Sequence, residues 1–181
     1  MRNTTKEKIL LLLLGGLAFG YSITYKKRWR AMKIVSEEWK RLNEEELKQG
    51  IRELCRYDFL DKTANKKGFV NLALTKKGRL RALNIQLENL KNKKEKWDGK
   101  WRMIAFDIPE KYKRERDALR QKLKNIGFRE LQKSVFITPV SCKKEMTDFI
   151  KFFELEKYVR FGILEFMDNE DNLKKYFKLS A

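Results

Sequence analysis

The chain has 181 residues, of which 42% are hydrophobic, so it has room for one large domain or two small domains with cores of their own. Its 43 Lys and Arg against 25 Asp and Glu give a formal net charge of +18, which attracts polyanions such as nucleic acid. The absence of histidine excludes His-based acid–base catalysis and His-ligated zinc, and the two cysteines, Cys55 and Cys142, lack metal-binding spacing. These features favour a reduced, cytoplasmic setting, although a generally solvated basic surface is the alternative explanation of the charge.

An apolar segment, Ile9 to Thr24, lies between basic residues near the start of the chain. It has about 16 residues, fewer than the roughly 20 that a membrane-spanning helix needs, and Gly15 and Gly16 interrupt it. No A-x-A-like cleavage site follows it. We therefore expect a buried first helix and no membrane partner, with association at a membrane as the alternative that the pattern leaves open.

Residues up to about 90 have the pattern of a winged helix-turn-helix domain. Apolar residues recur at helical spacing from Lys26 to Arg41, and Asn43 is a typical N-cap for a further helix that ends near Tyr57. Two short strand-like segments follow, around Phe59–Leu60 and from Phe69 to Leu74, and another helix opens at Thr75. The alternative is a small helical domain with solvated charges.

In a winged helix-turn-helix domain, the third helix enters the major groove and the hairpin touches phosphates. The third predicted helix places polar and basic residues opposite its apolar positions, and the hairpin turn carries two lysines. The glutamates at positions 44–46 would repel phosphate at the amino end of this helix. The predicted DNA-binding residues are Lys48, Gln49, Arg52, Arg56, Lys66 and Lys67.

A lysine-rich passage over residues 91–100 indicates a linker between two domains. Beyond it, over residues 101–181, strand-like and helix-like segments follow one another in the order βαββαβ. This order is that of the ferredoxin-like fold, with both helices on one face of an antiparallel sheet. The predicted fold class is therefore α+β. The expected segments are Trp101–Ile108, Lys111–Ile126, Phe128–Leu131, Val135–Thr138, a helix after Ser141, and Tyr158–Met167.

One carboxylate, Asp107, lies at the end of the first strand of this second domain. Pro109 stops the strand, because proline cannot continue a ladder of hydrogen bonds. The ends of strands often collect ligands, so Asp107 is a candidate metal ligand and catalytic residue. The alternative is an exposed side chain or a cap of the following helix.

Several motifs resemble the PaaX-like transcriptional regulators, whose central domain is itself similar to the smaller endonuclease of the CRISPR adaptation complex. The resemblance covers roughly residues 97–179, and a further motif resembles the end of the PaaX-like winged helix. The longer regulators carry an additional C-terminal domain, which this sequence lacks, so their acyl-CoA sensing is not expected here. The motifs are Trp97-Asp-Gly-Lys-Trp-Arg102, Phe106-Asp-Ile-Pro-Glu110, Gly127-Phe-Arg-Glu-Leu-Gln-Lys-Ser-Val-Phe136, Tyr158-Val-Arg160 and Leu74-Thr-Lys-Lys-Gly-Arg79.

The resemblance implies a homodimer, in which the two copies of Asp107 approach each other. Together they would offer two carboxylates to one Mg²⁺ or Mn²⁺, which are hard cations that prefer oxygen ligands. DNA binding itself would require no cofactor. The sequence thus favours a dimeric DNA-binding transcriptional regulator, most consistent with double-stranded DNA. A metal-dependent endonuclease acting on DNA or RNA and a non-catalytic nucleoprotein scaffold are the alternatives.

Overall fold

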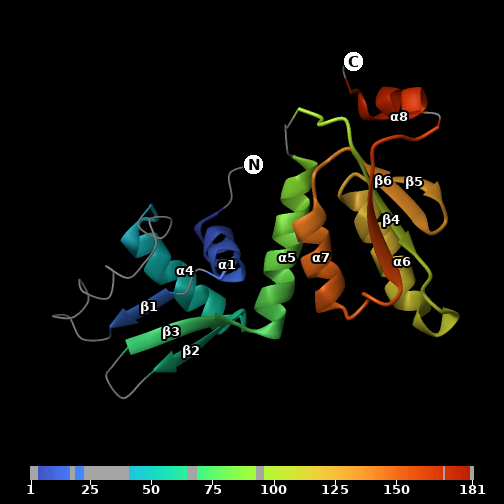
Figure 1. Ribbon diagram of the computed structural model, residues 1–181. Coiled ribbons are helices and arrows are strands. Elements are labelled where there is room, and N and C mark those ends of the chain that lie inside the picture. Colours follow the sequence, from blue (N-terminus) through green and yellow to red (C-terminus); the bar gives the residue numbers. More distant parts are fainter. Residues whose placement is uncertain are drawn as a thin grey trace. The chain divides into compact units, whose positions relative to one another are not determined.

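The computed structural model describes residues 4–16, 19–22, 41–64, 69–92, 96–168 and 170–179. The chain divides into two compact units, Met1–Gln86 (unit 1) and Leu87–Ala181 (unit 2), and the boundary falls within helix α5 (Figure 1). In the described residues, no helix combines the length and the apolar character needed to cross a membrane.

In unit 1, an antiparallel sheet with the strand order β1-β3-β2 packs against helices. β3 is the central strand and pairs Leu72 with Phe19 of β1 and Leu74 with Leu60 of β2. The β2–β3 hairpin lies between α4 and α5 in the chain (Figure 1). The described elements are α1 (Thr5–Leu14), β1 (Phe19–Ser22), α4 (Glu44–Arg56), β2 (Leu60–Ala64), β3 (Phe69–Leu74) and the start of α5 (Lys76–Lys91).

The prediction of one helix from Ile9 to Thr24 is wrong. α1 ends at Leu14, and β1 then pairs with β3. Gly15 is the C-cap and Gly16 has a φ of 81°, a left-handed conformation that favours glycine and stops the helix. Ile9 and Leu10 of α1 are nevertheless buried in the core of unit 1. The helix predicted over Lys26–Arg41 and the hairpin turn at 65–68 lie outside the described residues.

Helix α4 forms where the sequence predicts it. The Asn43 side chain accepts hydrogen bonds from the backbone N–H groups of Glu45 (3.0 Å) and Glu46 (3.1 Å), so it caps the helix as expected. The apolar positions recur every three or four residues and face the core of unit 1. The buried apolar side chains of α4 are Leu47, Ile51 and Leu54.

Unit 2 contains the predicted βαββαβ order, and its four strands form an antiparallel sheet with the order β5-β6-β4-β7. The α+β fold class is therefore confirmed. The elements are β4 (Trp101–Phe106), the short 3₁₀ helix η3 (Glu110–Tyr112), α6 (Lys113–Asn125), β5 (Arg129–Gln132), β6 (Val135–Thr138), α7 (Lys143–Phe152), β7 (Val159–Leu164) and α8 (Glu170–Phe177).

The two faces of this sheet have different partners, because neighbouring residues of a strand point to opposite faces. Ile104 and Phe106 of β4 share a core with the buried side chains of α6 and α7 and with Leu87 and Leu90 at the end of α5. Trp101 of β4 instead joins a second cluster with Ile137 and with Leu173 of α8. Both predicted helices thus cover one face, and α8, which the sequence pattern did not predict, packs on the other.

Candidate functional site

The DNA-binding residues predicted on α4 differ in whether their side chains are already paired with carboxylates of the same helix. The Lys48 ammonium lies 2.8 Å from carboxylate oxygens of both Glu44 and Glu45, and these hydrogen bonds raise the pKa of Lys48 above its ordinary value. Gln49 is exposed and donates a hydrogen bond to Glu53 (3.1 Å). Both side chains are therefore already engaged by carboxylates of their own helix.

Arg52 and Arg56 lie one turn apart on α4, and both are exposed. The guanidinium of Arg56 stands over the ring of Tyr57, 5.2 Å from its centroid, and the Tyr57 side chain is 55% exposed. These two arginines are the predicted residues best placed to meet an external anion. Lys66 and Lys67 lie outside the described residues.

Positive charge is concentrated in unit 1. Residues 1–86 carry 20 Lys and Arg against 9 Asp and Glu, whereas residues 87–181 carry 23 against 16. Unit 1 thus holds +11 of the total charge of +18 in slightly less than half of the chain. A charge of this density on a small unit favours a polyanionic partner.

The motif Leu74–Arg79 forms a junction between the carboxyl end of α4 and the start of α5. The Thr75 hydroxyl donates to the Asp58 carbonyl (2.7 Å), and the Lys77 ammonium donates to the Tyr57 carbonyl (2.8 Å). Gly78 is required, because a Cβ at this position would overlap the carbonyl oxygen of Phe59. The motif therefore fixes where α4 ends relative to α5. Lys77 also places a cation at the carboxyl end of α4, a role that the spacing of the motif did not indicate.

In unit 2, Asp107 directly follows β4, at the strand end where the sequence predicts it, and its side chain is exposed. Its backbone N–H donates to the Tyr158 carbonyl (2.9 Å), and the N–H of Phe106 donates to the Ser134 carbonyl (3.0 Å). These bonds hold the backbone at the end of the strand and leave the carboxylate facing solvent.

Two arginines on α6 hold the loops around Asp107. Arg116 donates to the Ile108 carbonyl (3.3 Å) and to the Glu110 carboxylate (2.7 Å). Arg120 donates to the Lys133 carbonyl (2.7 Å) in the turn between β5 and β6. The position of Asp107 is thus supported from both neighbouring loops.

The described residues of a single copy of unit 2 do not form a complete metal site. The nearest acid in sequence, Glu110, is paired with Arg116 and lies 3.8 Å from the Lys113 ammonium. Within the described ranges, no three His, Cys, Asp or Glu side chains gather where they could hold a metal ion. One carboxylate per chain is a poor ligand set for Mg²⁺ or Mn²⁺, so the Mg²⁺ expectation depends on a second copy of Asp107.

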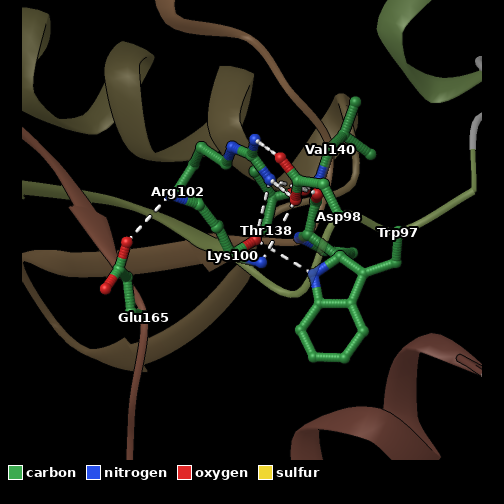
Figure 2. Close-up of polar contacts among 8 residues, drawn as sticks. Trp97, Asp98, Lys100, Arg102, Thr138, Val140 and Glu165 are labelled. Carbon is green, nitrogen blue, oxygen red and sulfur yellow. Dashed lines mark hydrogen bonds and ion pairs between the residues drawn. The ribbon is translucent and has the colours of Figure 1, made fainter. Parts of the chain in front are cut away.

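The motif Trp97–Arg102 forms a polar cluster around a buried cation (Figure 2). The Arg102 side chain is only 6% exposed, and its two terminal nitrogens donate to the two carboxylate oxygens of Asp98. Further bonds run from Arg102 to the carbonyls of Lys100 (2.7 Å) and Pro139 (3.0 Å). The hydrogen bonds from Arg102 lower the pKa of the Asp98 carboxyl to about 2. The cluster therefore joins the segment before β4 to the loop after β6.

An aromatic cluster lies beside this polar one and anchors α8. The ring centroids of Trp97 and Trp101 are 5.0 Å apart, and those of Trp101 and Phe177 are 5.8 Å apart. The indole N–H of Trp101 donates to Glu170 (2.9 Å) at the start of α8. Trp97 and Asp98, which the charge pattern assigned to a linker, are thus packed within unit 2. The spacing of the aromatic and charged residues in this motif did not predict its structural role.

The predicted site residues divide between the two units. Lys48, Gln49, Arg52 and Arg56 share α4 in unit 1, and Asp107 lies in unit 2. Within α4, the structure separates Lys48, which is paired with glutamates, from Arg52 and Arg56, which are exposed. The spacing of the residues predicted which of them share a face of α4, but not which of these cations are paired with carboxylates.

Comparison with known proteins finds a family match within unit 2. Residues 94–175 match the family described as the PaaX protein central Cas2-like domain. A solved structure, the uncharacterized protein Rv0674 from Mycobacterium tuberculosis, is 17% identical with a TM-score of 0.36, and the alignment covers 95% of this chain and 66% of that chain. The present chain therefore spans just under two thirds of that protein. No curated protein matches the chain. The match agrees with the βαββαβ order and with the motifs quoted from the sequence, and residues 94–175 are thus similar to the PaaX central, Cas2-like domain.

Proposed function

We propose that the protein is a DNA-binding transcriptional regulator of the PaaX-like type, which binds double-stranded DNA through unit 1. The observation that carries the proposal is the excess of +11 in unit 1 together with the exposed arginines Arg52 and Arg56 on one face of α4. A helix that follows a capped turn and precedes a hairpin is the arrangement by which winged helices enter the major groove. The PaaX-type domain in unit 2 supports a regulator over a general basic protein.

We further propose that unit 2 holds two copies of the chain together. On the face of the sheet that carries Trp101, the side chains of Met103, Ala105 and Val135 are only half-buried. At the edge of the sheet, Ile163 of β7 is 47% exposed. Apolar positions of this kind on a sheet face and an open edge favour pairing with a second copy.

A metal-dependent endonuclease is the second candidate, and Asp107 is the observation that favours it. Its carboxylate faces solvent, while its backbone is held by Tyr158. A single chain supplies one carboxylate at this strand end, so the activity would require the second copy of Asp107 and an Mg²⁺ or Mn²⁺ ion. The chain contains no histidine that could act as a general base beside it.

One experiment separates the two candidates. The full chain is mixed with a pool of genomic DNA fragments, with and without Mg²⁺, and the bound fragments are recovered and sequenced. The regulator predicts enrichment of full-length fragments that share a palindromic site, with the same site in both conditions. Fragments that are shortened only in the presence of Mg²⁺ would favour the nuclease, and recovery without any shared site would contradict sequence-specific regulation.

A further inference from the structure

The two ends of α4 differ sharply in charge, and this difference bears on how the helix meets DNA. At the amino end, Glu44, Glu45 and Glu46 are exposed, and Lys48 offsets one of them. The backbone N–H groups of Glu45 and Glu46, which could otherwise bind a phosphate, already donate to Asn43. The amino end therefore repels phosphate and has two of its donors occupied.

The carboxyl end of α4 has the opposite character. Arg52 and Arg56 are exposed there, and the Tyr57 side chain beneath Arg56 is exposed as well. The Lys77 ammonium is held at the same end by the Tyr57 carbonyl and stands 4.8 Å above the ring of Phe59. Since an ammonium carries three N–H donors, the bond to Tyr57 leaves donors for another acceptor.

Strand β2 adds a further cation on this side. Lys62 and the buried Leu60 lie on the same face of β2, because residues two apart in a strand share a face, whereas Asp61 lies on the other face. Leu60 packs with α4 in the core of unit 1, so Lys62 continues that face toward α4. Consistently, burial raises the pKa of the Cys55 thiol on α4, and the nearby Lys62 ammonium partly offsets this rise.

We propose that DNA meets unit 1 at the carboxyl end of α4, on a surface formed by Arg52, Arg56, Lys62 and Lys77 around Tyr57, and that the amino end of α4 faces away from the phosphates. This inference rests on the proposed DNA-binding function and reverses the polarity of the usual recognition helix, in which the amino-terminal residues contact the bases. Four cations from α4, β2 and α5 then face the polyanion, against the exposed carboxylates of Asp58 and Asp61.

The chemistry of this surface fits a DNA backbone. Arginine binds phosphate through paired N–H donors, and lysine contributes a compact charge, so the four cations suit a run of phosphates rather than one small anion. Tyr57 adds an exposed ring and a hydroxyl, which can donate to a phosphate or contact a sugar. Lys62 and Lys77 are the residues that this inference adds to those predicted from the sequence.

The test compares variants of the full chain for affinity toward a short duplex DNA of mixed sequence over a series of salt concentrations. In one variant, Lys62→Ala is combined with Lys77→Gln, which keeps a donor for the Tyr57 carbonyl. We expect this variant to bind about tenfold more weakly and to shallow the log–log salt slope by roughly 0.9 for each phosphate that it no longer neutralises. Lys8→Ala, which removes an exposed lysine of α1 in the same unit, is the control and should leave the affinity and the slope unchanged.

A second variant, Glu44→Gln with Glu45→Gln, probes the amino end. If that end faces away from the DNA, removing the two charges changes the affinity less than twofold. A large gain in affinity for this variant would overturn the inference. A salt slope equal to that of the wild type for the variant with Lys62→Ala and Lys77→Gln would overturn it as well. Thermal unfolding of each variant confirms that unit 1 is folded, and the single change Lys62→Ala repeats the test without touching the junction. If the wild-type chain binds no duplex at all, the proposed function fails as a whole, which is a different outcome.

Discussion

At the scale of single residues, Arg102 of unit 2 is a buried cation, and such a group requires a partner of opposite charge. The Arg102 side chain is only 6% exposed and depends on Asp98 for charge compensation. When a buried cation loses its partner, the cost of its desolvation remains. Removing one member of the pair therefore destabilises the fold by more than the intact pair stabilises it. The sequence showed Asp98 and Arg102 within one motif, but only the fold shows that the arginine is buried.

The first prediction follows from this pair. Asp98→Asn should lower the free energy of unfolding of the chain by about 1–3 kcal/mol at neutral pH, because Arg102 loses its compensating charge and one of the two oxygens that accept from it. Urea unfolding monitored by tryptophan fluorescence measures it, since Trp97 and Trp101 lie beside the cluster. Glu165→Gln, which breaks the exposed ion pair with Lys100, is the control and should have a much smaller effect.

The same pair predicts how stability depends on pH. The folded pKa of Asp98 is about 2, below the ordinary value of 3.8, so its contribution is complete above about pH 4 and is lost as the pH falls towards 2. The wild type should therefore lose more stability than Asp98→Asn over this interval. Parallel curves for the two proteins between pH 4 and pH 2 would show that the carboxylate does not stabilise the folded state.

A second residue-scale prediction concerns Asp107. The change Asp107→Asn keeps the shape of the side chain and removes its charge, so DNA binding by a regulator should be unaffected. Binding is measured by fluorescence anisotropy, and cleavage of the same duplex is followed with Mg²⁺ and with Mn²⁺. Metal-dependent cleavage by the wild type that the Asp107→Asn protein lacks would establish the endonuclease instead.

At the scale of elements, the sequence predicted those whose ends carry a strong local signal. Asn43 caps α4 as predicted, and the helix expected over Lys111–Ile126 ends just before Gly127, which has a φ of 95°. The apolar segment after Ile9 was harder, because a uniformly apolar stretch has no periodicity that distinguishes a helix from a strand. The partner of β1 is β3, a pairing of distant segments that local propensity cannot indicate. Helix α8 was not predicted from the sequence. Its few apolar residues pack on the cluster around Trp101, and the sequence does not show that contact.

The junction between α4 and α5 gives the third prediction. In Gly78→Ala the new methyl group meets the Phe59 carbonyl, so the free energy of unfolding should fall by at least about 1 kcal/mol, and DNA affinity should fall as the junction shifts. Thermal and urea unfolding measure the first effect. Gly15→Ala is the matched control, because its φ is −71° and the nearest atoms lie 3.5 Å away. Equal effects of the two changes would rule out a special role for Gly78.

A fourth prediction addresses how α4 reads DNA. If Arg52 contacts a base edge, Arg52→Ala should weaken binding to the selected site by about 1–3 kcal/mol and relax the preference at one position of that site. Affinities for a panel of single-position variants of the site measure both effects. An equal loss on every sequence would make Arg52 a contact to the phosphates alone, as inferred above for the four cations at the carboxyl end of α4.

At the scale of the whole molecule, the two units differ in how much of their structure could be predicted from the sequence. Unit 2 could be predicted closely, since its element order and motifs resemble a known domain and the family match confirms that resemblance. In unit 1, composition indicated a polyanionic partner, but the distribution of exposed and paired cations depends on contacts such as those of Lys48 with Glu44 and of Lys77 with Tyr57. Such contacts depend on side-chain geometry, so spacing alone could not supply them.

The central claim is that unit 1 binds DNA through the exposed cations of α4, and the salt dependence of affinity tests it most directly. The affinity of the full chain for its selected duplex is measured over a salt series, beside that of the Arg52→Ala, Arg56→Ala double variant. We predict a steep negative log–log slope for the wild type, and a slope shallower by about 0.9 for each phosphate that the double variant no longer neutralises. A wild-type slope near zero, or identical slopes and affinities for the two proteins, would contradict the claim.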